Sequence, residues 1–178
     1  FLFPCLILIG VYFIDRMTLI YSKKKIAIIF TFILGIICIN NLYNLIKLHP
    51  YQYIYFNSIF EKNANKLFEI DYWGVSNKNS LEKIAKNNPG NDKIVIGVAS
   101  FTDLNLSKKM LPTKLKSKII ISGQNYQNAD FIFNNNVSEI NPKFDDKYFI
   151  PKTFEKHLSM KRGNILINEF YKKGDKLN

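Results

Sequence analysis

Cysteine and histidine are scarce in this chain of 178 residues. Both cysteines, Cys5 and Cys38, fall inside apolar segments, where a free thiol behaves as a small hydrophobic side chain. No cysteine follows Cys38, which excludes a disulfide framework or a cysteine-based metal site in the rest of the chain. His49 and His157 alone cannot form a histidine-rich metal cluster. The sequence also lacks a G-x-G-x-x-G or Walker pattern, so no metal or nucleotide site is evident and the cofactor is unknown.

Arginine is nearly absent as well, although the formal net charge is +11. Of the 25 basic residues, only Arg16 and Arg162 are arginines, whereas nucleic-acid surfaces usually rely on Arg for bidentate contacts. Lys, Asn, Ile and Phe are all frequent together, which indicates a composition bias of the source genome. We therefore interpret the charge as lysines spread over a solvated surface, and we expect no nucleic-acid partner.

A long apolar run from Ile26 to Leu48 is the first strong positive feature. As a helix its 23 positions reach about 34 Å, enough to cross a hydrocarbon core of about 30 Å. Asn40 and Asn44 share one face of this helix, so they need partners from neighbouring helices or from headgroup water. The run predicts a membrane-spanning helix packed in a bundle.

A signal peptide is the alternative reading of this region, with Lys23, Lys24 and Lys25 as its charged part and the residues up to Cys38 as its apolar part. Two observations oppose it. Another apolar segment, 1–14, precedes the lysines, and bulky Ile residues rather than small ones stand before Cys38. We therefore favour a span.

The first 25 residues suggest how the chain crosses the membrane. Residues 1–14 resemble part of a preceding span, and 15–25 form a short basic loop, which the positive-inside rule places in the cytoplasm. The helix 26–48 then leads outward, so everything after it is expected in the periplasm or at the cell exterior. The chain begins at Phe1, without Met and inside an apolar run, and we expect it to be the C-terminal part of a longer reading frame.

Beyond the helix we expect an aromatic membrane-surface segment, 49–75, and a small extracytoplasmic α/β domain, 76–178. Pro50 must end the span, and Ser76 can cap a helix that Pro89-Gly90 stops. The β-branched run 93–100 predicts a buried central strand. The remaining predictions are a helix near 104–111, strands at 118–122 and 130–134, and a C-terminal β-hairpin of 152–161 and 165–172.

Two aromatic motifs supply the candidate site. Tyr and Trp prefer the lipid-water boundary, and hydroxyl, amide and carboxyl groups there could bind a lipid phosphate or a sugar headgroup. The same residues could instead only anchor the domain on the membrane lipids. The candidate substrate or lipid-interface residues are His49, Tyr51, Tyr53, Tyr55, Asn57, Asp71, Tyr72 and Trp73.

Other acidic residues give weaker signals. Asp103 and the pair Asp145-Asp146 could be catalytic or bind a metal, but each lies in a polar stretch where solvated turn carboxylates are common. We assign no catalytic residue and no metal ligand.

The two motifs, H-P-Y-Q-Y-x-Y-F-N from His49 and F-E-x-D-Y-W-G from Phe68, follow a final apolar helix. This pattern, over residues 1–88, resembles the C-terminal end of multi-pass bacterial glycosyltransferases related to the dolichyl-phosphate-mannose protein mannosyltransferases, of the GT-C fold. The resemblance implies transfer of a sugar from a polyprenyl-phosphate donor to an extracytoplasmic acceptor. It also implies that the catalytic acidic residue lies in a first outer loop that this chain does not contain, so the fragment alone is expected to be inactive.

Two other functions stay open from the sequence. A non-enzymatic, membrane-anchored interaction domain would use the aromatic residues only to seat itself on the bilayer. A membrane-tethered hydrolase would need a convergent nucleophile and base, and Ser122-Gly123 is too little to predict a nucleophile elbow.

Overall fold

The computed structural model describes residues 2–20, 24–56, 58–90, 92–135 and 148–174. The chain divides into two compact units, Phe1–His49 and Pro50–Asn178.

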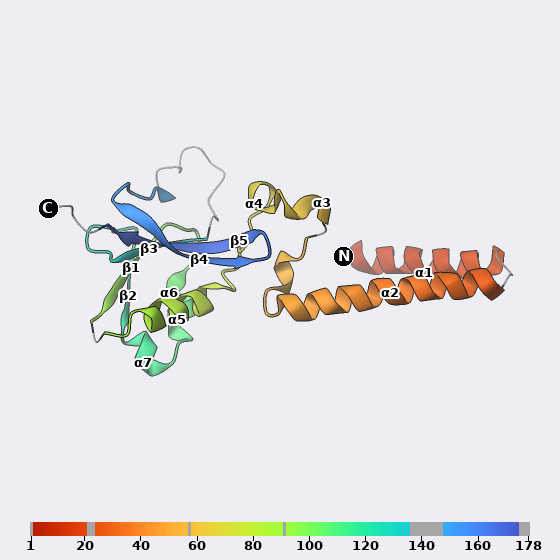
Figure 1. The fold of residues 1–178 in the computed structure, drawn as a ribbon, viewed down its shortest axis with the longest axis horizontal. Helices are drawn as coiled ribbons and strands as arrows, with labels where there is room; N and C mark the ends of the chain where they lie inside the picture. Colours follow the sequence, from red (N-terminus) through yellow and green to blue (C-terminus); the bar gives the residue numbers. More distant parts are fainter. Residues whose placement is uncertain (1, 21–23, 57, 91, 136–147, 175–178) are drawn as a thin grey trace. The chain divides into compact units, whose positions relative to one another are not determined.

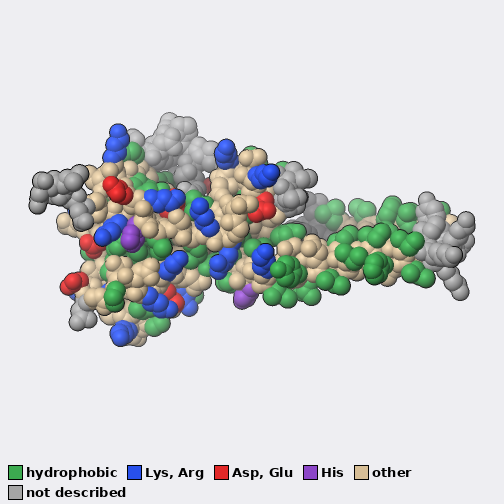
Figure 2. All heavy atoms as spheres, in the orientation of Figure 1, with side chains coloured by type: hydrophobic (Ala, Val, Ile, Leu, Met, Phe, Trp, Pro, Cys, Tyr) green, Lys and Arg blue, Asp and Glu red, His purple; other side chains and the backbone are tan. Residues whose placement is uncertain are grey.

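The first unit holds the helices α1 (Leu2–Ile20) and α2 (Lys24–Leu48) (Figure 1). Among the described residues, the segment Ile28–Leu48 of α2 is long and apolar enough to be a candidate membrane span. Large hydrophobic side chains are exposed along both helices, and they cover much of the surface of this unit in Figure 2. The predicted stop before Pro50 is confirmed, because α2 ends at Leu48.

The bounds of the expected cytoplasmic loop, 15–25, need correction. Helix α1 continues to Ile20 instead of ending at Ile14, and α2 begins at Lys24. One reason is local: the guanidinium Nε of Arg16 donates to the hydroxyl of Tyr12, one turn earlier, at 3.0 Å. This contact lets a charged residue continue the helix. Only 21–23 separate the two helices, and these lie outside the described residues.

The second unit opens with three short helical segments, all within the predicted aromatic segment 49–75. They are the 3₁₀ helix η1 (Gln52–Ile54) and the helices α3 (Ser58–Glu61) and α4 (Ala64–Leu67). The sequence did not predict them, since polar residues and aromatic residues alternate there without a helical period.

A mixed five-stranded sheet forms the centre of the second unit, in the order β2-β1-β3-β5-β4 (Figure 1). β1 pairs in parallel with β2 and β3, whereas β5 is antiparallel to β3 and β4. The α/β class is therefore confirmed, but β3 rather than β1 takes the middle position. The strands are β1 (Ile94–Val98), β2 (Ile119–Gly123), β3 (Phe131–Asn134), β4 (Phe154–Arg162) and β5 (Ile165–Lys173).

Helices α5 (Asn77–Asn87), α6 (Leu104–Lys109) and α7 (Thr113–Lys116) lie around the parallel half of the sheet (Figure 1). Alternation along β3 separates two cores. Phe131 and Phe133 pack with α5 residues such as Leu81 and Ile84, while Ile132 packs on the other face. Period-two alternation in a strand buried on both faces produces this division. The hairpin prediction is also confirmed, with Gly163 at φ 57° in its turn.

Candidate functional site

Asp71 is the centre of a buried polar network in the second unit. Its side chain is fully buried, at 0% exposure. The hydroxyl of Tyr53 donates to Oδ1 at 2.7 Å, and the hydroxyl of Ser76 donates to Oδ2 at 2.5 Å. The backbone N–H groups of Val75 and Ser76 also donate to this carboxyl group. The two sequence motifs, 18 residues apart at Tyr53 and Asp71, are thereby joined.

Two buried asparagines extend the network to the sheet. At the end of β3, the amide of Asn135 donates to the carbonyl of Asp71 and to the hydroxyl of Thr102, both at 3.1 Å. On β5, the amide of Asn168 donates to the hydroxyl of Ser76 at 2.5 Å. The network therefore ties the loop at Asp71 to the carboxyl ends of β1 and β3, and to α5. In open α/β sheets, this end of the parallel strands is where ligands usually bind.

The predicted capping role of Ser76 is not what its side chain does. Ser76 does precede α5, but its hydroxyl makes no cap and is turned to Asp71. The hydrogen bond to a carboxyl group five residues earlier in the chain thus takes the place of the local cap.

Burial sets the protonation of this site. It raises the pKa of Asp71 above the usual 3.8, and the hydrogen bonds from Ser76 and Tyr53 only partly offset the effect. Burial, followed by the hydrogen bond to Asp71, likewise raises the pKa of Tyr53, so its hydroxyl stays protonated and donates at neutral pH. Because Asp71 is enclosed, it can position Tyr53 but cannot itself touch a substrate.

The stability of the second unit should depend on pH through Asp71. A carboxyl group whose folded-state pKa is raised binds its proton more tightly when folded. Its stabilising contribution is therefore complete below the unfolded pKa and is lost as pH rises through the folded pKa. We expect the free energy of unfolding of the wild-type chain to fall more steeply with rising pH than that of Asp71→Asn, which cannot titrate. Urea unfolding between about pH 4 and pH 8 measures this difference; parallel profiles would contradict it.

The other predicted site residues differ in their exposure. Tyr51 is buried, at 1% exposure, with its hydroxyl accepting from the amide of Asn79 at 2.6 Å and its ring beneath Arg162. Tyr51 and Asp71 were both candidate residues for contact with lipid or substrate. Both are buried inside the second unit instead, so neither side chain is available for such a contact. Tyr53, Tyr55 and Tyr72 are partly exposed, His49 is exposed beyond α2, and Asn57 lies outside the described residues.

Trp73 is largely exposed, at 84%, and it lines a groove of about 670 Å³. Tyr72 lies beside Trp73, with the two rings edge-on and their centroids 5.2 Å apart. The ring of Tyr72 is also stacked on that of Phe101, with 6.1 Å between the centroids. The groove runs along the carboxyl end of β1, the start of α5 and one side of α6. Its other lining residues include Pro50, Asn77, Thr102, Asp103, Leu106 and Met110.

Gly74 also lines the groove, and its position requires a residue without a side chain. Its φ of 63° is a left-handed conformation, and a Cβ there would stand 2.5 Å from the amide nitrogen of Asn77. That amide donates to Thr102 at 3.2 Å, while the oxygen of Asn77 is buried without a hydrogen-bond partner.

Sequence reasoning missed Phe101, Leu106 and Met110. A signal was present, because Phe101 directly follows the predicted buried strand 93–100, and Leu106 and Met110 are spaced four apart on a predicted helix. Of the acidic candidates, Asp103 caps α6 by accepting from the N–H of Asn105 at 2.8 Å. Asp145-Asp146 lies outside the described residues. Within the described part of the chain, no group of three potential metal ligands occurs.

No protein-family model matches the chain, and no curated protein or solved structure matches it either. The fold and site together define a mixed α/β domain that follows a long apolar helix, with a buried carboxyl network beneath an exposed aromatic groove.

Proposed function

We propose that the chain is the C-terminal part of an integral-membrane glycosyltransferase, which transfers a sugar from a polyprenyl-phosphate donor to an extracytoplasmic acceptor. The observation that carries the proposal is the hydrogen bond from Tyr53 to Asp71. The resemblance to the mannosyltransferase-like enzymes rests on two separate motifs, and this bond makes them parts of one structural unit. Such a unit gives a physical reason for the motifs to occur together.

Membrane attachment through α2 is part of the proposal. Ile28–Leu48 would be about 32 Å long as a helix, and large hydrophobic side chains are exposed along it. Its polar residues are Thr31 near the start and Asn40, Asn41, Asn44 and Lys47 toward the C-terminal end. A helix with so much apolar surface belongs in a membrane or in a large core. With Lys23, Lys24 and Lys25 on the cytoplasmic side, the second unit would lie outside the cytoplasm.

In this proposal the second unit supports catalysis rather than performing it. Asp71 holds the hydroxyl of Tyr53, and the catalytic carboxylate belongs to another part of the protein. The hydroxyl and the aromatic rings beside it can contact the lipid-linked donor at headgroup depth.

The test is sugar transfer by the complete membrane protein that carries this chain, reconstituted with radiolabelled polyprenyl-phosphate sugars. We expect wild type to remove label from the lipid phase. Tyr53→Phe should lower the rate about tenfold, equivalent to ~1.4 kcal/mol in the barrier, because the ring loses the bond that positions it.

Tyr171→Phe is the matched control, since it also removes a tyrosine hydroxyl that donates to a carboxylate, Glu169, at 2.8 Å. That contact lies on β5, and its loss should leave transfer unchanged. Absence of transfer by the wild-type protein from every polyprenyl-phosphate sugar offered would refute the proposal. An equal loss of transfer rate in both variants would mean that Tyr53 has only a structural role.

A second candidate is a non-enzymatic membrane-anchored interaction domain, and the exposure of Trp73 and its neighbours favours it. It predicts that groove substitutions alter assembly in native membranes while no sugar transfer is found in any variant. The transfer assay therefore separates the two candidates.

A further inference from the structure

Two large apolar side chains are exposed on α6 and at its C-cap, next to the polar Asn105 and Lys109. Leu104 and Ser107 face inward and are buried, which leaves Leu106 and Met110 exposed at 61% and 66%. A surface helix normally places charged or polar residues on its exposed side. Together with Tyr72, Trp73 and Phe101, these side chains line one continuous groove, so the apolar exposure is a patch rather than scattered single residues.

We propose that this groove face rests in the headgroup region of a phospholipid bilayer. The inference needs a membrane span in α2 but does not depend on sugar transfer. Three observations favour a bilayer over another occupant.

The first observation is the path of the chain. Pro50 lines the groove, and one residue separates it from Leu48, the end of α2. An extended chain covers at most about 3.6 Å per residue. Covalent connection therefore keeps this edge of the groove close to the end of the candidate span, whatever the angle between the two units.

The second observation is the residue chemistry. Trp and Tyr are the side chains most enriched at the lipid-water boundary, because their rings prefer the acyl edge while their polar atoms need water. Leu106 and Met110 add aliphatic surface, which cannot form hydrogen bonds with the hydroxyl groups of a saccharide. A small polar ligand would also leave most of this open apolar surface in contact with water.

The third observation is charge. Lys78 lines the groove, and Lys108 and Lys109 lie on α6 next to groove residues, whereas Asp103 is the acidic residue of the lining. Lysines near an anionic membrane surface are attracted to its negative potential. The aliphatic stems of these lysines can also cover apolar surface while their ammonium groups stay in water.

Trp73 reports on its own position, because it is the only Trp in the chain. We would reconstitute the full chain in vesicles of phosphatidylcholine, with and without phosphatidylglycerol, that carry bromine at defined acyl positions. If the groove face is seated in the bilayer, lipids brominated near the headgroup should remove most of the Trp73 emission, and aqueous acrylamide should quench it weakly. The lipid quenching should increase with phosphatidylglycerol.

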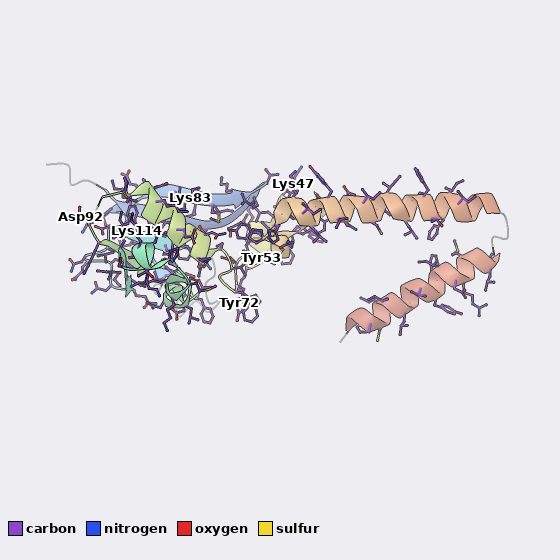
Figure 3. The ribbon with its side chains drawn as sticks, turned by 90° about the horizontal axis from the view of Figure 1, so that it is seen from below. Lys47, Tyr53, Tyr72, Lys83, Asp92 and Lys114 are labelled. Atoms are coloured by element: carbon purple, nitrogen blue, oxygen red, sulfur yellow. The ribbon has the colours of Figure 1, made fainter. Side chains whose placement is uncertain are left out.

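The control moves the reporter. In Trp73→Phe/Lys114→Trp the single Trp is placed on α7, and Lys114 lies at the opposite end of the second unit from Tyr72 (Figure 3). This variant should be quenched by acrylamide and not by the brominated lipids.

A pair of charge substitutions tests the surface rather than the reporter. Leu106→Glu should at least halve the lipid quenching of Trp73, while Phe149→Glu, at a similarly exposed position (58%) outside the groove lining, should leave it unchanged. Circular dichroism checks that both variants keep their secondary structure. Acrylamide quenching of Trp73 equal to that of the Lys114→Trp reporter would overturn the proposal. So would protection without lipid quenching, since a second copy or a soluble ligand would then cover the groove.

Discussion

Asp71→Ala is expected to lower the free energy of unfolding of the second unit by about 3 kcal/mol or more. The substitution removes the common acceptor of the Tyr53 and Ser76 hydroxyls and of two backbone N–H groups. Leaving a buried donor unsatisfied costs about 1 to 3 kcal/mol. The expected loss is large against the total stability of a domain of this size, about 5 to 15 kcal/mol.

The measurement is urea unfolding of the full chain in a mild detergent, followed by Trp73 fluorescence and circular dichroism. Asp92→Ala is the control, because Asp92 is an exposed carboxylate at the far end of the second unit (Figure 3). It should change the unfolding free energy by less than about 0.5 kcal/mol. Asp71→Asn should fall between the two, because its amide keeps the shape and one acceptor. A loss no greater for Asp71→Ala than for Asp92→Ala would mean that the network does not stabilise the fold.

Phe170→Ala is the second substitution with a large expected effect. Phe170 is fully buried on β5, directly opposite Phe133 on β3, and the two rings meet edge-on at 5.3 Å. Removing a buried phenyl ring costs about 3 to 5 kcal/mol through lost burial and the cavity left behind. The aromatic pair adds about 0.5 to 1.5 kcal/mol. We expect a variant close to the limit of folding.

The same urea titration tests this expectation, with Phe149→Ala as its control. Phe149 is 58% exposed, so truncating it should change stability by less than about 1 kcal/mol. If Phe170→Ala unfolds at the same urea concentration as the control, the contact between Phe170 on β5 and Phe133 on β3 does not contribute to a shared core. Phe133→Ala should reproduce the effect of Phe170→Ala, because each residue is the other's partner.

Local patterns in the sequence were sufficient for most of the secondary structure. The continuous β-branched run at 94–98, the short apolar runs at 119–123 and 131–134, and the turn at Gly163 all carried signals that depend on neighbouring residues alone. The end of α2 was equally local, since Pro50 cannot continue a helix. The segment 52–67 was harder, because its short helices lack a hydrophobic period and depend on packing for their stability.

The candidate site divides in the same way. From the sequence, Tyr53, Asp71 and Trp73 are candidate site residues, and all three are predicted to lie at the lipid-water boundary. In the structure Asp71 is buried, whereas Trp73, two residues later, is 84% exposed. The partners that enclose Asp71 come from Tyr53, Ser76 and Asn135, positions up to 64 residues away.

Sequence by itself therefore determined an apolar helix long enough to span a bilayer, an α/β domain after it, and two aromatic motifs between them. Only the tertiary structure decided which residues of those motifs are core and which form a surface. The physical reason is that periodicity and residue type are set by near neighbours. Burial, pKa and groove shape depend instead on strand order, which brings the ends of β1 and β3 to the loop at Asp71.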